Sequence, residues 1–176
     1  MTGPESRLPG RHVESRTLDE YQQLLLGGRP TLTADQLAEK SGIPIDEVHN
    51  YLLEMGFSHV EHDEVRFTER DLDILVRWTE AAEAAGLAPN TTASLARAQS
   101  HLSDRLALWE IEALVEGVER RTGLDDTSAR VVAINEMRQM VDTLEEQMVY
   151  AWRRQMYALI ERMTREIAGR SSDHSS

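Results

Sequence analysis

The segment VYAWRRQM, residues Val149–Met156, lies at the centre of a terminal stretch, Leu124–Ala168, that contains neither glycine nor proline. Such a stretch predicts helix almost throughout. One straight helix over residues 128–168 would extend roughly 60 Å at 1.5 Å per residue, whereas a compact globule of this chain length has a radius of gyration of only about 16 Å. The helix is therefore expected to break, bend or project, and a half-apolar helix of this kind points to a docking partner.

Apolar residues recur along this stretch at a mean spacing of about 3.75 residues, which exceeds the heptad value of 3.5. A long left-handed coiled coil is therefore not expected, and packing against a bundle is preferred. Thr143 and Glu146 have the spacing of a capping box, which predicts a break near Asp142 and Thr143. The residues of this apolar stripe are Met137, Val141, Leu144, Met148, Trp152, Met156, Leu159, Met163 and Ile167.

The composition favours helices and a soluble, acidic protein. The 31 acidic residues outnumber the 19 Lys and Arg residues, giving a net charge of −12 that should repel phosphate polymers and anionic membranes. The absence of cysteine excludes disulfides and thiolate zinc sites. No apolar run approaches the roughly 20 residues of a membrane span, and no signal-peptide core is present near the start. The sequence therefore predicts a cytoplasmic protein without a membrane span.

Helix-start signals divide the first half of the chain. Thr17 with Glu20, Thr33 with Gln36, and Thr68 with Asp71 are spaced as N-terminal caps of three helices. The predicted organisation is a disordered lead over 1–16, an all-α helical domain over 17–168 and a disordered tail over 169–176. Within the domain we expect a helix-turn-helix-like part over 31–67 with a small β wing, a central helix over 92–122, and a terminal helix or broken helix pair over 128–168.

The helix-turn-helix-like part resembles the opening of MerR-type transcriptional regulators in its layout. Its second helix, Ile45–Met55, presents Asp46, Glu47 and Glu54 but neither Lys nor Arg, and residues 31–67 carry a net charge of −6 from eight acidic and two basic residues. A helix that reads DNA must present donors or cations to bases and phosphates. We therefore predict that no nucleic acid is bound, and a MerR-like regulator remains the alternative function.

The histidines are candidates for pH sensing. His62 lies beside three carboxylates in the segment His59-Val60-Glu61-His62-Asp63-Glu64, which should favour its protonated form. His49, His59 and His101 are further candidates. Two histidines alone do not supply the three or four convergent ligands of a metal site, so no metal is predicted.

The central helix carries two apolar stripes. One contains Leu95, Leu102, Leu106, Trp109 and Ala113, and the other contains Leu108, Ile111, Val115 and Val118. A helix that is apolar on two sides is expected to be buried on two sides. Because one chain of this size covers both sides with difficulty, we predict a homodimer whose interface draws on Trp109 and Trp152.

No catalytic pattern is visible in the sequence. There is no nucleophile with a base, no glycine-rich phosphate loop and no carboxylate pair at a plausible spacing. The chain is therefore predicted not to be an enzyme, and no cofactor is expected.

Two segments together resemble the N-terminal regulatory domain of actinobacterial class III adenylate cyclases. They are LSDRLALWEIEAL at 102–114 and LEEQMVYAWRRQM at 144–156, and the shorter matches MGF at 55–57 and DEVRFT at 63–68 support them. The resemblance extends over residues 31–168, and its most specific part is the Val-Tyr-x-Trp-Arg-Arg run.

This resemblance implies a pH-sensing, autoinhibitory domain that dimerises and restrains or activates a class III cyclase catalytic domain, in cis or in trans, which would make cyclic AMP from ATP. It also implies a fatty acid or lipid-like ligand as a second input. The metal-binding aspartates of a cyclase have no counterparts in this sequence. A helical adaptor that only dimerises is the third hypothesis. The residues expected to form the dimer and output surface are Trp109, Met148, Tyr150, Trp152, Arg153, Arg154 and Met156.

Overall fold

The computed structural model describes residues 15–173, and these residues divide into two compact units at the boundary between Asn135 and Glu136. The described part is all-helical, as the sequence predicts. The first unit contains α1 (Ser15–Leu26), α2 (Ala34–Ser41), α3 (Ile45–Glu54), α4 (Glu69–Ala84), α5 (Pro89–Thr122) and most of α6 (Asp126–Glu136). The second contains a 3₁₀ turn, η1 (Met137–Gln139), and α7 (Val141–Asp173).

Two of the predicted helix starts are confirmed as complete capping boxes. The Thr33 hydroxyl accepts a hydrogen bond from the backbone N–H of Gln36, whose side chain accepts one from the Thr33 backbone. Thr68 and Asp71 do the same at the start of α4. Each box satisfies two backbone donors that a helix N-terminus otherwise leaves without partners. Thr17 is not a helix cap, because α1 begins before it, at Ser15.

The larger core lies between α2, α3 and α4. Gly42 ends α2 in the left-handed conformation at φ 72°, which a glycine adopts without strain, and this reverses the chain into α3. The apolar faces of the three helices then meet around two aromatic rings, Phe57 and Phe67, whose centroids are 5.3 Å apart in an edge-to-face arrangement. The buried members of this core are Leu32, Ala34, Leu37, Val48, Leu52, Phe67 and Leu75.

The predicted β wing is wrong. Within residues 15–173 no β-strand forms, and the only pairing is an isolated antiparallel bridge between Leu32 and Phe67. The two residues exchange backbone N–H···O bonds of 2.9 and 3.0 Å. The side chains of Leu32 and Phe67 enter the core. Residues 61–64, which carry three carboxylates and His62, are exposed in the loop between them. A winged helix-turn-helix is therefore not supported.

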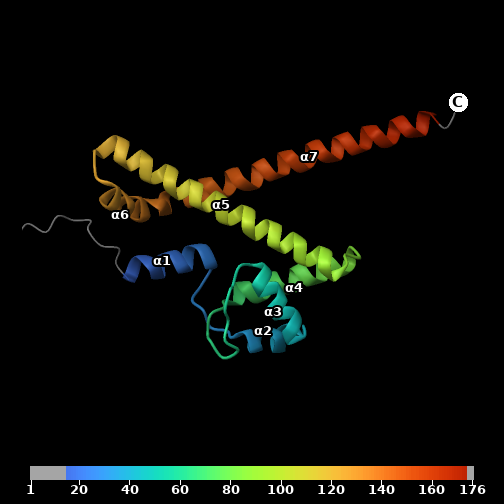
Figure 1. Ribbon diagram of the computed structural model, residues 1–176, viewed down its shortest axis with the longest axis horizontal. Helices are drawn as coiled ribbons and strands as arrows, with labels where there is room; N and C mark the ends of the chain where they lie inside the picture. Colours follow the sequence, from blue (N-terminus) through green and yellow to red (C-terminus); the bar gives the residue numbers. More distant parts are fainter. Residues whose placement is uncertain (1–14, 174–176) are drawn as a thin grey trace, which may run out of the picture. The chain divides into compact units, whose positions relative to one another are not determined.

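The long helix α5 covers the predicted 92–122 helix and is the longest described helix of the first unit (Figure 1). Its N-terminal part lies against α3 and its C-terminal part against α6. There Val115 and Val118 pack on Ala129 and Ala133 to form a second, smaller core. The Tyr21 hydroxyl of α1 donates a hydrogen bond to the carbonyl of Ile134 in α6.

The second unit is a single helix preceded by one 3₁₀ turn. The break in the terminal stretch falls at Met137–Gln139, a few residues before the predicted break at residues 142–143. Helix α7 then continues through Ala168 to Asp173, so residues 169–173, predicted to be disordered, are helical. Of the predicted disordered lead over 1–16, residues 15–16 belong to α1, whereas residues 1–14 lie outside the described residues, as do residues 174–176 of the predicted tail. Among the helices that are described, none combines the length and apolarity that a bilayer crossing requires.

Candidate functional site

Two of the four candidate histidines meet between α2 and α3. His62, in the loop before α4, places its Nδ1 atom 3.0 Å from a carboxylate oxygen of Asp35 in the first turn of α2. Its ring centroid is 4.5 Å from that of His49 in α3, with the ring planes tilted by 38°. The His49 Nε2 atom is buried and has no hydrogen-bond partner among the described residues. The sequence analysis predicted neither the role of Asp35 nor the contact between the rings of His49 and His62.

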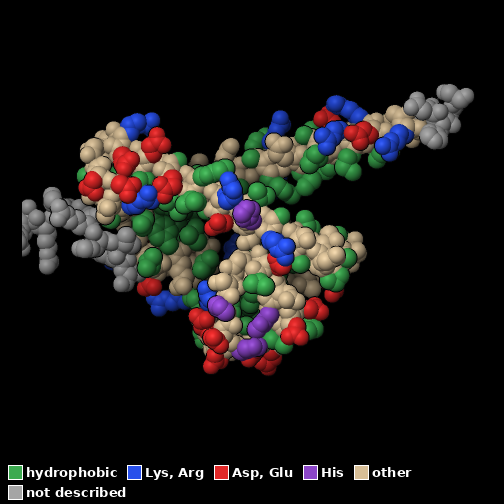
Figure 2. All heavy atoms as spheres, in the orientation of Figure 1, with side chains coloured by type: hydrophobic (Ala, Val, Ile, Leu, Met, Phe, Trp, Pro, Cys, Tyr) green, Lys and Arg blue, Asp and Glu red, His purple; other side chains and the backbone are tan. Residues whose placement is uncertain are grey.

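The contact between His62 and Asp35 differs in kind between a charged and a neutral imidazole. A protonated His62 forms an ion pair with Asp35, whereas a neutral His62 offers only a hydrogen bond. Protonation of both rings would place two positive charges side by side, which is unfavourable. Acidic residues surround the cluster, and Figure 2 shows histidine side chains gathered over this end of the first unit with red carboxylates around them. Because both partners of the pair are about 60% exposed, its contribution to stability is small.

The other two candidate histidines lie elsewhere. His59 is exposed in the same loop, and its carbonyl accepts a hydrogen bond of 2.7 Å from Arg66. His101 is exposed on α5, in a shallow depression next to Leu53 and Met55. The structure therefore joins His49 and His62 into one cluster and leaves His59 and His101 outside it.

The middle of α5 is uncovered within the first unit. Trp109 is 61% exposed, and Leu102, Leu108 and Ile111 are also exposed. The guanidinium of Arg105 lies 5.4 Å from the Trp109 ring centroid, which holds the ring by a cation–π contact. The expectation that both stripes of this helix are buried is wrong for the single chain, because only its two ends have neighbours.

The residues of α7 that were predicted for the output surface lie on different faces of this helix. At 100° per residue, Met148 and Met156 each point about 40° to either side of Trp152, so the three side chains share one face. Tyr150 points about 160° away from Trp152 on the same geometry. One flat interface on α7 therefore cannot contain both aromatic side chains.

The apolar face of α7 has no cover within its own unit, because that unit holds no second long helix. Trp152 is 60% exposed and Ile167 is 63% exposed. Figure 2 shows apolar side chains along α7, interspersed with charged ones toward its C-terminal end. Ion pairs between residues four apart, such as Glu161 with Arg165, line the polar side.

Two ion pairs tie α5 to its neighbouring helices α3 and α6, and the sequence analysis predicted neither of them. Arg97 donates to both carboxylate oxygens of Glu54 at 2.5 and 2.6 Å, and Arg130 donates to both oxygens of Glu112 at 2.7 and 3.0 Å. The hydrogen bonds from these guanidiniums lower the pKa of Glu54 and of Glu112 below the ordinary value of 4.5. The partners are 43 and 18 residues apart in sequence, so no local pattern predicts them.

Comparison with known proteins supports a relation to nucleotide cyclases. The chain is 29% identical to a protein of Glutamicibacter nicotianae over 165 residues, which are 93% of this chain and 41% of that protein. It is 29% identical over 156 residues to a protein of Streptomyces coelicolor, covering 88% of this chain and 39% of the relative. A Streptomyces griseus protein is 27% identical over 144 residues, or 81% and 35% of the two lengths.

All three relatives are named adenylate cyclase. The chain thus has adenylate cyclase homologues in actinobacteria across most of its length. It spans about two fifths of the length of the curated relatives it matches. No family model matches the chain. The MerR-like alternative is not favoured, since the similarity is to cyclases and the described residues form no wing.

Proposed function

We propose that this chain is the regulatory domain of a class III adenylate cyclase, without catalytic residues of its own. It dimerises, and it restrains or activates a cyclase catalytic domain in cis or in trans in response to pH or a lipid-like ligand. The observation that carries the proposal is the similarity to three adenylate cyclases over most of this chain but less than half of each relative.

The uncovered apolar surfaces support the dimerisation part of the proposal. A face such as that of Met148, Trp152 and Met156 is costly to leave in water. A second copy of the chain offers the same face, which is the requirement of a two-fold symmetric interface. The exposed middle of α5 around Trp109 supplies a second contact surface of the same kind.

The cluster of His49, His62 and Asp35 supports a response to pH. We propose that protonation strengthens the contact between His62 and Asp35 and adds repulsion between the two rings, so that α2 and α3 change their preferred spacing. His59 and His101 are secondary candidates because neither lies in this cluster. Helix α7 is the proposed output element, in which a change of register or of the η1 break alters how two catalytic domains meet.

A chimera tests the proposal. Residues 1–176 replace the matched part of the Glutamicibacter nicotianae adenylate cyclase, and cyclic AMP formation is measured from pH 5.5 to 8. The unmatched part of the relative alone is the reference. We expect the chimera to differ from this reference in activity and in its pH profile, and Asp35→Asn or His62→Gln to flatten that profile. Asp63→Asn, a neighbouring exposed carboxylate without this contact, should leave it unchanged.

Alanine insertions after Ala168 test whether α7 transmits the signal. At 3.6 residues per turn, two inserted alanines rotate everything beyond them by about 200°, whereas four leave a net rotation of about 40°. We expect the two-residue insertion to abolish regulation and the four-residue insertion to retain much of it. If both insertions behave like the parent chimera, or if the chimera equals the unmatched part alone at every pH, the proposal is wrong.

A further inference from the structure

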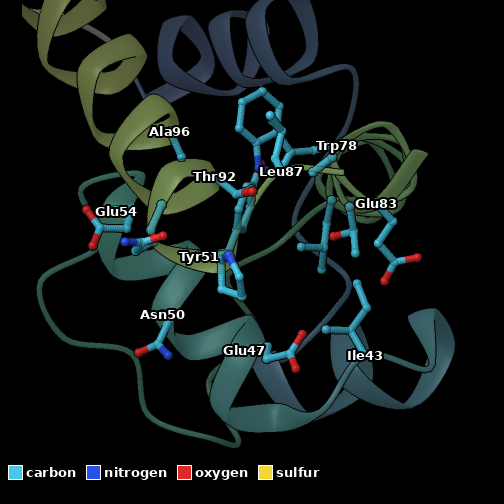
Figure 3. Close-up of a pocket in the computed structure, with 16 residues that line it drawn as sticks. Ile43, Glu47, Asn50, Tyr51, Glu54, Trp78, Glu83, Leu87, Thr92 and Ala96 are labelled. Atoms are coloured by element: carbon cyan, nitrogen blue, oxygen red, sulfur yellow. The ribbon is translucent and has the colours of Figure 1, made fainter. Parts of the chain in front are cut away.

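A cavity of about 480 Å³ opens between α3, α4 and the first turns of α5, entirely within the first unit (Figure 3). Its floor is apolar: Leu75 and Ala96 are each only 2% exposed, and Ala82 is 8% exposed. Tyr51 and Trp78 add two half-buried aromatic rings to the lining. A volume of this size is typical of cavities that hold small organic molecules.

The polar part of this lining carries one sign of charge. Glu47 and Glu54 come from α3 and Glu83 from α4, and none of the 16 lining residues is Lys or Arg. Figure 3 shows Tyr51 in the middle of the lining, Glu47 and Glu83 on one side of it and Glu54 on the other. Three carboxylates around an apolar floor disfavour an anionic head group.

The three glutamates differ in whether a positive charge pairs with them. Glu54 is already neutralised by its bidentate contact with Arg97, which also fastens the end of α3 to α5. Ser100 strengthens the same junction by donating a hydrogen bond of 3.0 Å to the carbonyl of Met55. Among the residues that the structure describes, Glu47 and Glu83 form no ion pair and are exposed at the rim. The cavity wall is therefore fixed, while two negative charges at its mouth have no counter-charge.

The aromatic residues suit the same kind of guest. Burial, with a contribution from the charge of Asp71, raises the pKa of the Tyr51 phenol above its ordinary value of 10, so this ring stays neutral at physiological pH. Neutral Trp and Tyr rings attract a positive charge through the negative face of the π system. Rings that line the cavity and carboxylates at its rim thus favour a cation attached to an apolar body.

We propose that this cavity binds a small organic cation that carries an apolar body, such as an alkylammonium compound. The hydrocarbon part lies over Leu75, Ala82 and Ala96, and the ammonium group lies at the rim between Glu47 and Glu83. This site goes beyond the proposed regulatory role, because its occupancy can be measured without any cyclase domain. It also differs from a fatty-acid site, since a carboxylate head would meet like charges at the rim.

The test is calorimetric titration of the full chain with two probes of equal chain length and opposite charge, octyltrimethylammonium and octanoate. We expect the cation to bind at least about tenfold more tightly than the anion, since it exchanges like-charge for opposite-charge contacts. We also expect its affinity to fall as salt is raised from 50 to 500 mM, because partly exposed charges are screened.

Matched variants locate the site. Glu47→Gln and Glu83→Gln keep the side-chain shape at exposed positions. Each is expected to weaken binding of octyltrimethylammonium by about fivefold. Asp46→Asn and Glu80→Gln are the controls, because they remove charges from the same two helices without lining the cavity. Ala93→Leu fills the cavity from α5 and should abolish binding of both probes while the helical circular dichroism is retained.

Two results would overturn the proposal. One is octanoate binding as tightly as octyltrimethylammonium, which assigns the cavity to an anion or to apolar guests in general. The other is an unchanged affinity for the cation in the double variant Glu47→Gln with Glu83→Gln, which places any binding elsewhere on this acidic protein.

Discussion

Replacement of Trp152 by alanine should separate the proposed dimer. The indole is 60% exposed in the single chain, and an aromatic side chain of this size presents up to about 250 Å², so roughly 150 Å² is available for contact. At about 25 cal/mol per Å², covering that area contributes up to about 4 kcal/mol for each copy. Alanine retains a small part of it. We therefore expect Trp152→Ala to raise the dimer dissociation constant by about 100-fold or more.

The helix itself is not expected to suffer from this change. Alanine has the highest helix propensity of any residue, and Trp152 lies far from both ends of α7. A loss of association therefore cannot be attributed to a melted helix. Circular dichroism of the variant at the same concentration should show an unchanged helical signal.

Tyr157→Ala is the matched control for this experiment. Tyr157 is 62% exposed on the same helix, and it points about 140° away from Trp152 at 100° per residue. Sedimentation equilibrium across the micromolar range should show Tyr157→Ala associating like the parent chain. If Trp152→Ala leaves association unchanged, or if both variants weaken it equally, the assignment of the interface to the Met148, Trp152 and Met156 face is refuted.

Three further predictions concern stability and pH. Asp35→Asn removes the carboxylate that contacts His62 and should lower the free energy of unfolding in urea by no more than about 1 kcal/mol, because both partners are about 60% exposed; a loss above about 2 kcal/mol would contradict this. The pKa of Glu54 is lowered by Arg97, so its stabilising contribution is present above the unfolded value of 4.5 and is lost as the pH falls through the folded value. Chemical denaturation should accordingly show Glu54→Gln losing less stability than the parent between pH 6 and pH 3, and a parallel loss would count against the pair. Phe67→Ala removes a fully buried ring and should cost about 3–5 kcal/mol of unfolding free energy in urea denaturation, with a cost below about 1 kcal/mol being incompatible with the observed core.

Local signals in the sequence predicted much of the helical fold. A capping box depends only on residues three apart, so Thr33 with Gln36 and Thr68 with Asp71 could be recognised directly. The glycine at position 123 ends α5 for a similarly local reason, because it adopts the left-handed conformation after the last turn. These features are properties of short segments, and tertiary contacts did not overrule them.

The β wing shows where such reasoning fails. Val60, Val65 and Phe67 have side chains typical of strands, and their pattern alone predicted a ribbon. Phe67 is instead drawn into the helical core, where it contacts Phe57, and a single bridge to Leu32 satisfies the backbone. The burial of one large side chain thus decided the conformation of this loop.

The candidate sites depended on contacts that no sequence pattern shows. His62 was recognised from its acidic neighbours in the chain, yet the carboxylate it contacts belongs to Asp35, 27 residues away. The cavity could not be predicted at all, because its rim combines Glu47 of α3 with Glu83 of α4 and its wall includes the start of α5. Sites assembled from three helices become visible only when the packing of those helices is known.

The structure of α5 connects the fold to the proposed function. At 1.5 Å per residue this helix extends about 51 Å. It is tied to α3 by the ion pair of Arg97 with Glu54 and to α6 by the ion pair of Glu112 with Arg130. Neither core covers the stretch around Trp109. A partner that binds the middle of α5 therefore contacts the helix that packs on α3 near its start and on α6 near its end. A partner that binds only the native state stabilises that state. Such a partner would therefore make the folding of the two cores interdependent. A domain needs this interdependence if a proton taken up near α2 is to influence the far end of α5.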